Sequence, residues 1–280
     1  MPSADAHLHL FSDGFAGPLG PQVEGYDELA VYERLRRHYG IERGLVVGYE
    51  GEPRYLSNND YILALSRARP WIVPLAYLHL YPAPTVGHLR SLRERGAVGY
   101  SIYLPGENEA LALCDWSAAI LSELNSQPTL ISLNAPVAAL ATIAPPLASL
   151  DCCQILFSHL GLPGRFARPP SLRVARECLA PLTSFSVLGH AGVKFSGLYG
   201  CCDPAHDFPH LSAQPLVQVV LDTFGPGRLL WGSDFSPALD FVSFAQLTDT
   251  RLLSGCSTDE ISAVMGGNLV RLLKNLTREE

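Results

Sequence analysis

The segment Asp5-Ala-His7-Leu-His9 places two imidazoles and a carboxylate close together near the start of the chain. Side chains alternate between the two faces of an extended strand, so Asp5, His7 and His9 are expected to point to the same side. Two neutral imidazoles on one face can bind one divalent ion. Such a pair also arises by chance in a chain with nine histidines. Its place at the end of a predicted strand is what indicates chemistry.

Two more ligand-type side chains end later predicted strands. His159 ends the run Leu156-Phe-Ser-His159, and Asp234 ends the run Leu230-Trp-Gly-Ser-Asp234. Three histidines and one aspartate suit Zn²⁺ or a similar ion. Structural roles stay open for both residues: a histidine held by backbone groups for His159, and a helix N-cap for Asp234.

Short apolar runs of the β type alternate with helix-type stretches along the chain. The predicted strands start 25 to 39 residues apart, which suits a strand followed by a helix and is too long for hairpins. Several are apolar on both faces, as in a parallel sheet covered by helices. The eight predicted strands span residues 4–10, 43–49, 72–78, 97–103, 128–133, 154–159, 193–198 and 229–234.

The predicted helices carry start and stop signals. Asp27 is expected to cap a helix that Gly40 ends, and Asp115 to cap another. The clearest helices span residues 27–39, 59–69, 86–95 and 115–125. Eight strand–helix units in 280 residues predict an α/β fold, a (β/α)8 TIM barrel, whose functional residues gather at the carboxyl ends of the strands. A doubly wound sheet is the alternative, but no Gly-x-Gly-x-x-Gly follows the first strand.

Composition narrows the class of protein. The chain has 280 residues, 48% of them hydrophobic, and a formal net charge of −7. We expect one domain over residues 1–280 and no nucleic-acid partner, since such a partner favours a basic surface. No apolar run approaches the roughly 18 residues that cross a bilayer, and the first residues lack signal-peptide features. We therefore expect a cytoplasmic protein with no membrane partner and reduced cysteines; a homodimer stays open.

Five segments also occur, in this order, in a known family: Asp5-Ala-His-Leu-His-Leu-Phe11, Phe157-Ser-His-Leu-Gly-Leu-Pro163, Val193-Lys-Phe-Ser-Gly-Leu198, Arg228-Leu-Leu-Trp-Gly-Ser-Asp234 and Gly266-Gly-Asn-Leu-Val-Arg-Leu-Leu273. Through them the chain resembles the amidohydrolase superfamily. The similar branch contains single-domain sugar-lactone and pyrone-dicarboxylate lactonases and related non-oxidative decarboxylases. The resemblance implies a metal site formed by His7, His9, His159 and Asp234. It also implies that Asp234 is the general acid/base, with His159 beside it in the catalytic machinery.

The chain departs from the family's pattern at informative places. Members with two metals bridge them with a carboxylated lysine on strand four, whereas the lysines here are Lys194 and Lys274. The resemblance thus implies at most one divalent metal, Zn²⁺ or Mn²⁺, and since some lactonases of the branch use none, a metal-free mechanism stays open. The strand-four arginine of the lactonases is replaced by Tyr100-Ser101. Its loss argues against a dicarboxylate substrate, because bidentate anion binding needs a guanidinium group.

Other residues at strand ends are candidates for binding a small-molecule substrate. Lys194, inside the seventh predicted strand, or His79, after the third, would polarise a carbonyl group. The proline-rich segment 199–210 is typical of a loop that sets substrate choice. Structural roles stay open for all of them, and with few arginines nearby we expect an uncharged or singly charged cyclic substrate. The candidates are Tyr49, His79, Tyr103, Asn134, Lys194, Tyr199 and His206.

The leading hypothesis for function is metal-dependent hydrolysis of a small cyclic ester, as in a lactonase. A metal held by neutral imidazoles lowers the pKa of a bound water towards about 7. Asp234 would accept the proton of that water and return it to the leaving oxygen. A decarboxylase-type lyase would use the same four residues and is the second hypothesis. A non-catalytic binding barrel is the third, and amide or imine hydrolysis also stays open.

Overall fold

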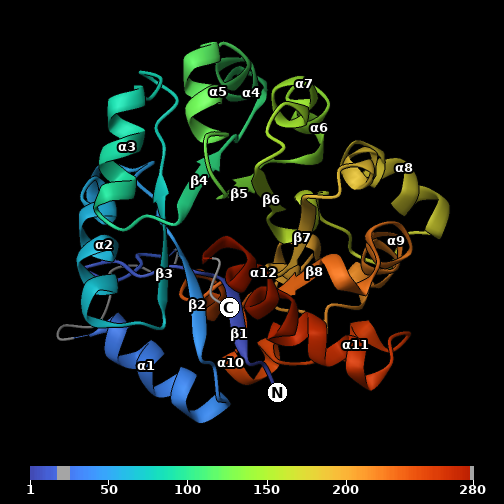
Figure 1. The fold of residues 1–280 in the computed structure, drawn as a ribbon. Helices are drawn as coiled ribbons and strands as arrows, with labels where there is room; N and C mark the ends of the chain where they lie inside the picture. The colour runs from blue at the N-terminus through green and yellow to red at the C-terminus, as the bar shows by residue number, and fades with distance from the viewer. Residues whose placement is uncertain (18–25, 278–280) are drawn as a thin grey trace.

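The computed structural model describes residues 1–17 and 26–277, and its centre is a barrel of eight parallel strands. Each strand pairs with the next along the chain (Figure 1). Backbone hydrogen bonds from His9 N to Phe235 O (2.5 Å) and from Asp234 N to His7 O (2.7 Å) join the end of the last strand to the first. The predicted TIM barrel is confirmed. Its strands are β1 (Ala4–Leu8), β2 (Arg43–Val47), β3 (Ile72–Tyr77), β4 (Gly99–Tyr103), β5 (Thr129–Asn134), β6 (Cys153–Phe157), β7 (Ala191–Phe195) and β8 (Leu229–Trp231).

Helices surround the barrel (Figure 1). The Asp27 side chain caps the first one by accepting a 2.9 Å hydrogen bond from Ala30 N, and Gly40 ends it with φ +75°. The helices are α1 (Glu28–Tyr39), α2 (Asn58–Ala68), α3 (Val86–Glu94), α4 (Glu107–Cys114), α5 (Ala118–Leu124), α6 (Val137–Leu140), α7 (Ala144–Ala148), α8 (Leu172–Thr183), α9 (Gln214–Phe224), α10 (Phe244–Leu247), α11 (Thr258–Ser262) and α12 (Asn268–Thr277).

The predicted cap of one helix is wrong. Asp115 does not begin a helix, because its backbone N–H closes the last turn of α4 on Leu111 O. Ser117 caps α5 instead, with its side chain accepting from Ile120 N. Residues 115–125, which were predicted as one helix, therefore contain the C-cap of α4 and the whole of α5.

Six predicted strands are too long at their carboxyl ends. The strands predicted over residues 4–10, 43–49, 72–78, 154–159, 193–198 and 229–234 end at Leu8, Val47, Tyr77, Phe157, Phe195 and Trp231. His159 and Asp234 have φ angles of +53° and +55°, which no strand accommodates. Both residues therefore lie in the loops that follow β6 and β8, at the carboxyl end of the barrel.

The amino end of the barrel is closed by α12. Leu269 and Leu273 of this helix pack with Ala4 and Ala6 of β1 in the apolar cluster that fills the barrel interior. The Asn268 amide donates to Leu229 O at the start of β8 (2.7 Å). Because α12 seals this end, polar residues that reach solvent from the barrel do so at the carboxyl end.

The expected orientation of Asp5 is wrong, because the register of β1 against β2 shifts between Asp5 and Leu8. Ala6 faces the barrel interior, while the Asp5 carboxylate accepts from Tyr32 OH of α1 (2.8 Å). It also accepts from His7 N (3.1 Å) and from Ser233 N (2.9 Å). Asp5 therefore ties β1 to α1 and to the segment after β8, and only the two histidines point to the same side.

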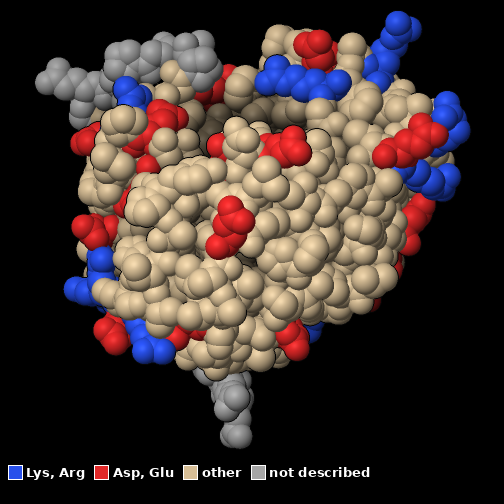
Figure 2. Space-filling view, turned by 90° about the horizontal axis from the view of Figure 1, so that it is seen from above, with Lys and Arg blue, Asp and Glu red and all other residues tan. Residues whose placement is uncertain are grey.

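The surface seen in Figure 2 carries few charged side chains at its centre, and Lys and Arg lie towards its margins. Helices α3 to α7 lie on that side of the molecule (Figure 1). In the part of the chain that the structure describes, no helix has the length and apolar character needed to cross a membrane.

Candidate active site

Three buried ligand atoms converge at the carboxyl ends of β1 and β8. His7 Nε2 lies 3.2 Å from His9 Nε2, and Asp234 Oδ1 lies 3.6 Å from the first and 3.9 Å from the second. All three side chains are buried. Donor atoms about 2.0–2.2 Å from a tetrahedral Zn²⁺ are about 3.3–3.6 Å apart, so these residues fit a divalent ion with little rearrangement.

The tautomer of His9 suits a metal ligand. Its Nδ1 lies 2.7 Å from Val47 O at the end of β2. A carbonyl oxygen only accepts, so Nδ1 carries the proton and Nε2 presents its lone pair to the cluster. Such a hydrogen bond behind the ring also fixes its orientation.

A fully buried lysine contacts His7 at Nδ1, the ring nitrogen that does not face His9. Lys194 Nζ of β7 lies 2.9 Å from His7 Nδ1 and donates to Ser132 Oγ of β5 (2.6 Å). Burial, partly opposed by Asp234 and Asp5, lowers the pKa of Lys194 to about 7. The prediction that Lys194 lies inside the seventh strand is confirmed, but its amine points at the back of an imidazole and lines no part of the substrate pocket described below.

The two oxygens of Asp234 face different partners. Oδ1 lies towards the imidazoles, while Oδ2 accepts from Tyr199 OH (2.6 Å). Burial raises the pKa of Asp234 to about 6, and His9, Tyr199 and Lys194 act in the opposite direction. Tyr199 comes from the loop after β7, so this predicted residue contacts the carboxylate.

His159 lies beside the three-residue cluster. Its ring centroid is 4.5 Å from that of His7, and its Nδ1 is 4.0 Å from Asp234 Oδ2. The group of atoms able to share one ion does not include it. Its Nδ1 lies 3.0 Å from Ser196 Oγ after β7. Burial, then the charge of Lys194, lowers the pKa of His159 to about 3, so the ring is held neutral.

Gly197 leaves the space that His159 occupies. A Cβ at this position would lie 2.3 Å from His159 Nδ1, and the glycine has φ +59°. We expect Gly197→Ala to displace the imidazole and to lower kcat/KM about 10²-fold, as displacements near 1 Å do. Steady-state kinetics check this, with Gly200→Ala as the control because its Cβ would meet nothing within 4 Å. Equal activity of the Gly197→Ala and Gly200→Ala variants would contradict a role for His159 in the reaction.

An open pocket of about 510 Å³ lies beyond β2 to β5. Burial, then the nearby Asp234 carboxylate, raises the pKa of Tyr103 well above its usual value, so this pocket wall lies within electrostatic reach of the cluster. His206 is exposed and does not line the pocket. The predicted residues that do line it are Tyr49, His79, Tyr103 and Asn134.

The other lining residues were not predicted from the sequence, among them Glu50, Glu52, Tyr77 and Glu109. The Glu50 carboxylate accepts from Asn59 N (2.9 Å) and lies 3.3 Å from His79 Nε2. Glu50 directly follows Tyr49 after a strand, so the strand-end rule applied to acidic residues finds it. Tyr77 is the last residue of β3 and could have been found in the same way.

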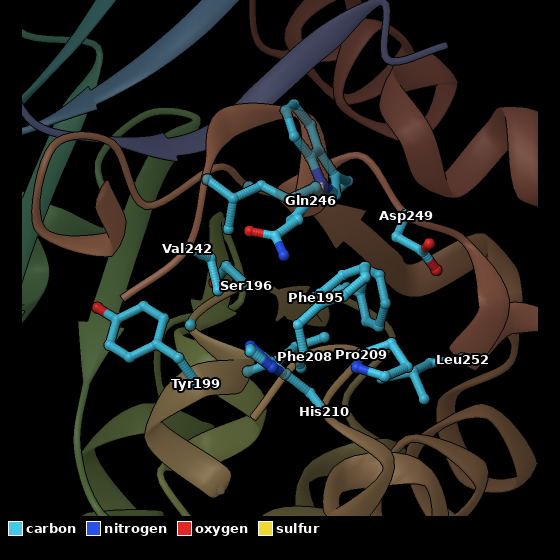
Figure 3. Close-up of a pocket in the computed structure, with 15 residues that line it drawn as sticks. Phe195, Ser196, Tyr199, Phe208, Pro209, His210, Val242, Gln246, Asp249 and Leu252 are labelled. Carbon is cyan, nitrogen blue, oxygen red and sulfur yellow. Dashed lines mark hydrogen bonds between the residues drawn. The ribbon is translucent and has the colours of Figure 1, made fainter. Parts of the chain in front are cut away.

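A second, smaller cavity lies between the outer side of β7 and β8 and the segment 242–252. Figure 3 shows it with Ser196 and Tyr199 on one side and Asp249 and Leu252 on the other. Its volume of about 40 Å³ is too small for a metabolite. Ser196 and Tyr199 line this cavity, and they also contact His159 and Asp234. The cavity is therefore part of the packing around these two site residues and is not a substrate pocket.

A closed parallel barrel with a buried polar cluster at the carboxyl ends of its strands defines the class of TIM-barrel enzymes. Residues 4–274 match the family model described as Amidohydrolase, and the chain belongs to this family. It is therefore an enzyme, a hydrolase or a related lyase. Among curated protein sequences, none matches this chain.

Solved structures share the fold at low identity. An amidohydrolase from Burkholderia multivorans with bound zinc has a TM-score of 0.75 at 20% identity, over 97% of this chain and 99% of that chain. A proposed 2-pyrone-4,6-dicarboxylic acid hydrolase from Pseudomonas putida has 0.72 at 23% identity, over 97% of each chain. The 2,6-dihydroxybenzoate decarboxylase from Rhizobium has 0.61 at 11% identity, over 98% and 99%.

Proposed function

We propose that this protein is a metal-dependent hydrolase of a small cyclic ester and that His7, His9 and Asp234 hold one divalent ion, Zn²⁺ or Mn²⁺. The observation that carries the proposal is the convergence of two imidazole nitrogens and one carboxylate oxygen within 4.8 Å of one another, all buried. The zinc bound in the Burkholderia relative supports the choice of metal.

Each residue of the site has its own role in the proposed hydrolysis. When bound, the ion supplies Lewis-acid activation of a water molecule. Asp234 accepts the proton of the attacking water at Oδ2, which Tyr199 OH orients from 2.6 Å, and returns it to the leaving oxygen. His159, 4.0 Å from Oδ2, stays neutral and donates a hydrogen bond to the substrate carbonyl. Lys194 is a positioning residue that holds His7 through Nδ1.

A lyase reaction is the second candidate function, and the likeness to the Rhizobium decarboxylase favours it. Both reactions would use the same buried cluster beside the same pocket. What separates them is the product, because only the lyase releases CO2 from a carboxylic acid.

A panel of lactones and aromatic carboxylic acids tests the proposal on the zinc-loaded and manganese-loaded protein. We expect acid release from at least one lactone, followed by pH-stat titration, and no CO2 from any acid. CO2 release without lactone opening would replace the hydrolase by the lyase. A metal-loaded protein that opens no lactone and releases no CO2 would contradict both.

A further inference from the structure

The substrate pocket is acidic, and the basic side chain among its described lining residues is His79, which lies 3.3 Å from the Glu50 carboxylate. Glu50, Glu52 and Glu109 line it, and no Lys or Arg does so among the described residues. Among the described residues, Glu50 pairs with His79, whereas Glu52 and Glu109 take part in none of the ion pairs. Residues 18–25, in the segment that follows β1, contain no Lys or Arg in the sequence. An anionic substrate would therefore meet like charge here, and the basic lining residue His79 is already paired with Glu50.

Three tyrosine rings pack against one another and form one wall of this pocket. The centroids of Tyr49 and Tyr103 are 5.0 Å apart, and that of Tyr77 is 5.7 Å from each. Burial, then the charge of Glu52, raises the pKa of Tyr49, which places Glu52 beside the wall. Aromatic faces with nearby carboxylates attract a cation and do not attract an anion.

The wall also contains a polar group that points to a ligand. The Tyr77 side chain is more than nine-tenths buried. Its hydroxyl has no hydrogen-bond partner among the described residues, yet it retains some exposure and lines the pocket. The hydroxyl therefore opens into the pocket, where a substrate group can replace water as its hydrogen-bond partner.

We propose that the substrate is a cyclic ester bearing a positively charged, amine-type substituent, which the tyrosine wall and the Glu50, Glu52 and Glu109 carboxylates select over a carboxylate. This inference rests on the proposed hydrolase function for its reaction, although the charge selection itself depends only on the pocket. It sets this chain apart from a hydrolase of a pyrone dicarboxylate.

Three lactones that differ only in one substituent test the selection: trimethylammonium, the isosteric neutral tert-butyl group, and carboxylate. We expect kcat/KM for the trimethylammonium lactone to exceed that for the tert-butyl lactone at least about tenfold and that for the carboxylate about 10²-fold. In Glu52→Gln/Glu109→Gln the first ratio should fall to about threefold or less. Glu42→Gln/Glu94→Gln changes the net charge equally at two exposed positions outside the pocket and should leave it unchanged.

Binding of the three corresponding cyclic ethers, which cannot be hydrolysed, separates the two proposals. Calorimetry should give the same order of affinity, with the same response to both double variants. That order without lactone hydrolysis would leave the charge selection standing and overturn the hydrolase. A carboxylate bound as well as the ammonium, an unchanged ratio in the pocket variant, or no binding of any ether would overturn the charge selection.

Discussion

The His7→Ala/His9→Ala variant is expected to lose the bound divalent metal and at least about 10³-fold in kcat/KM. Protein purified without chelator should contain about one equivalent of zinc or manganese, and the variant should contain almost none. Two of the three converging donor atoms are removed, and a single carboxylate does not retain Zn²⁺. Losing several kcal/mol of Lewis-acid stabilisation corresponds to at least this rate effect. Elemental analysis and steady-state kinetics check both parts.

The matched control is His38→Ala/His88→Ala, which removes two exposed imidazoles and should retain both the metal and the activity. Absence of metal from the parent protein would contradict the proposed metal centre. Activity in such a protein would then require Asp234 to activate water without an ion. Metal retained at one equivalent in the His7/His9 variant would place the ion elsewhere.

The Asp234→Asn variant is expected to lose about 10³- to 10⁴-fold in kcat, with KM within about threefold. The amide keeps the shape of the side chain but does not accept the proton of the attacking water. It also weakens the hydrogen bond from Tyr199, because a neutral oxygen is a poorer acceptor than a carboxylate. Kinetics at saturating metal separate this loss from weaker metal binding.

Tyr199→Phe provides the graded comparison for this experiment. It keeps the carboxylate and removes only the 2.6 Å hydrogen bond to Oδ2, so kcat should fall about tenfold. If Asp234→Asn fell no further than Tyr199→Phe, the carboxylate would be a ligand only, and the acid/base role would pass to another group.

The barrel was predictable from the chain because strand–helix units recur at the spacing that parallel strands require. The strand-end rule also predicted Tyr49, His79, Tyr103 and Asn134, four residues that share one pocket. That rule needs only the order of elements, since all carboxyl ends of a parallel barrel meet at one face. It succeeds without any knowledge of loop geometry.

Other features of the site depend on local geometry that alternation does not reveal. The register shift in β1 turns Asp5 towards Tyr32, and a period-two pattern contains no signal for such a shift. The direction of Lys194 depends on its partner Ser132, which lies 62 residues away along the chain. Ser196 and Gly197 lie against the His159 ring, and the backbone of His159 is left-handed. The sequence pattern contains no signal for either feature.

The burial of Lys194 has a practical consequence for handling the protein. The chain has two lysines, and Lys194 is fully buried while Lys274 is exposed on α12. The exposed lysine therefore lies at the amino end of the barrel, which α12 covers. Coupling through lysine side chains to a sensor chip or resin would attach every molecule by that end and leave the substrate pocket facing the solution.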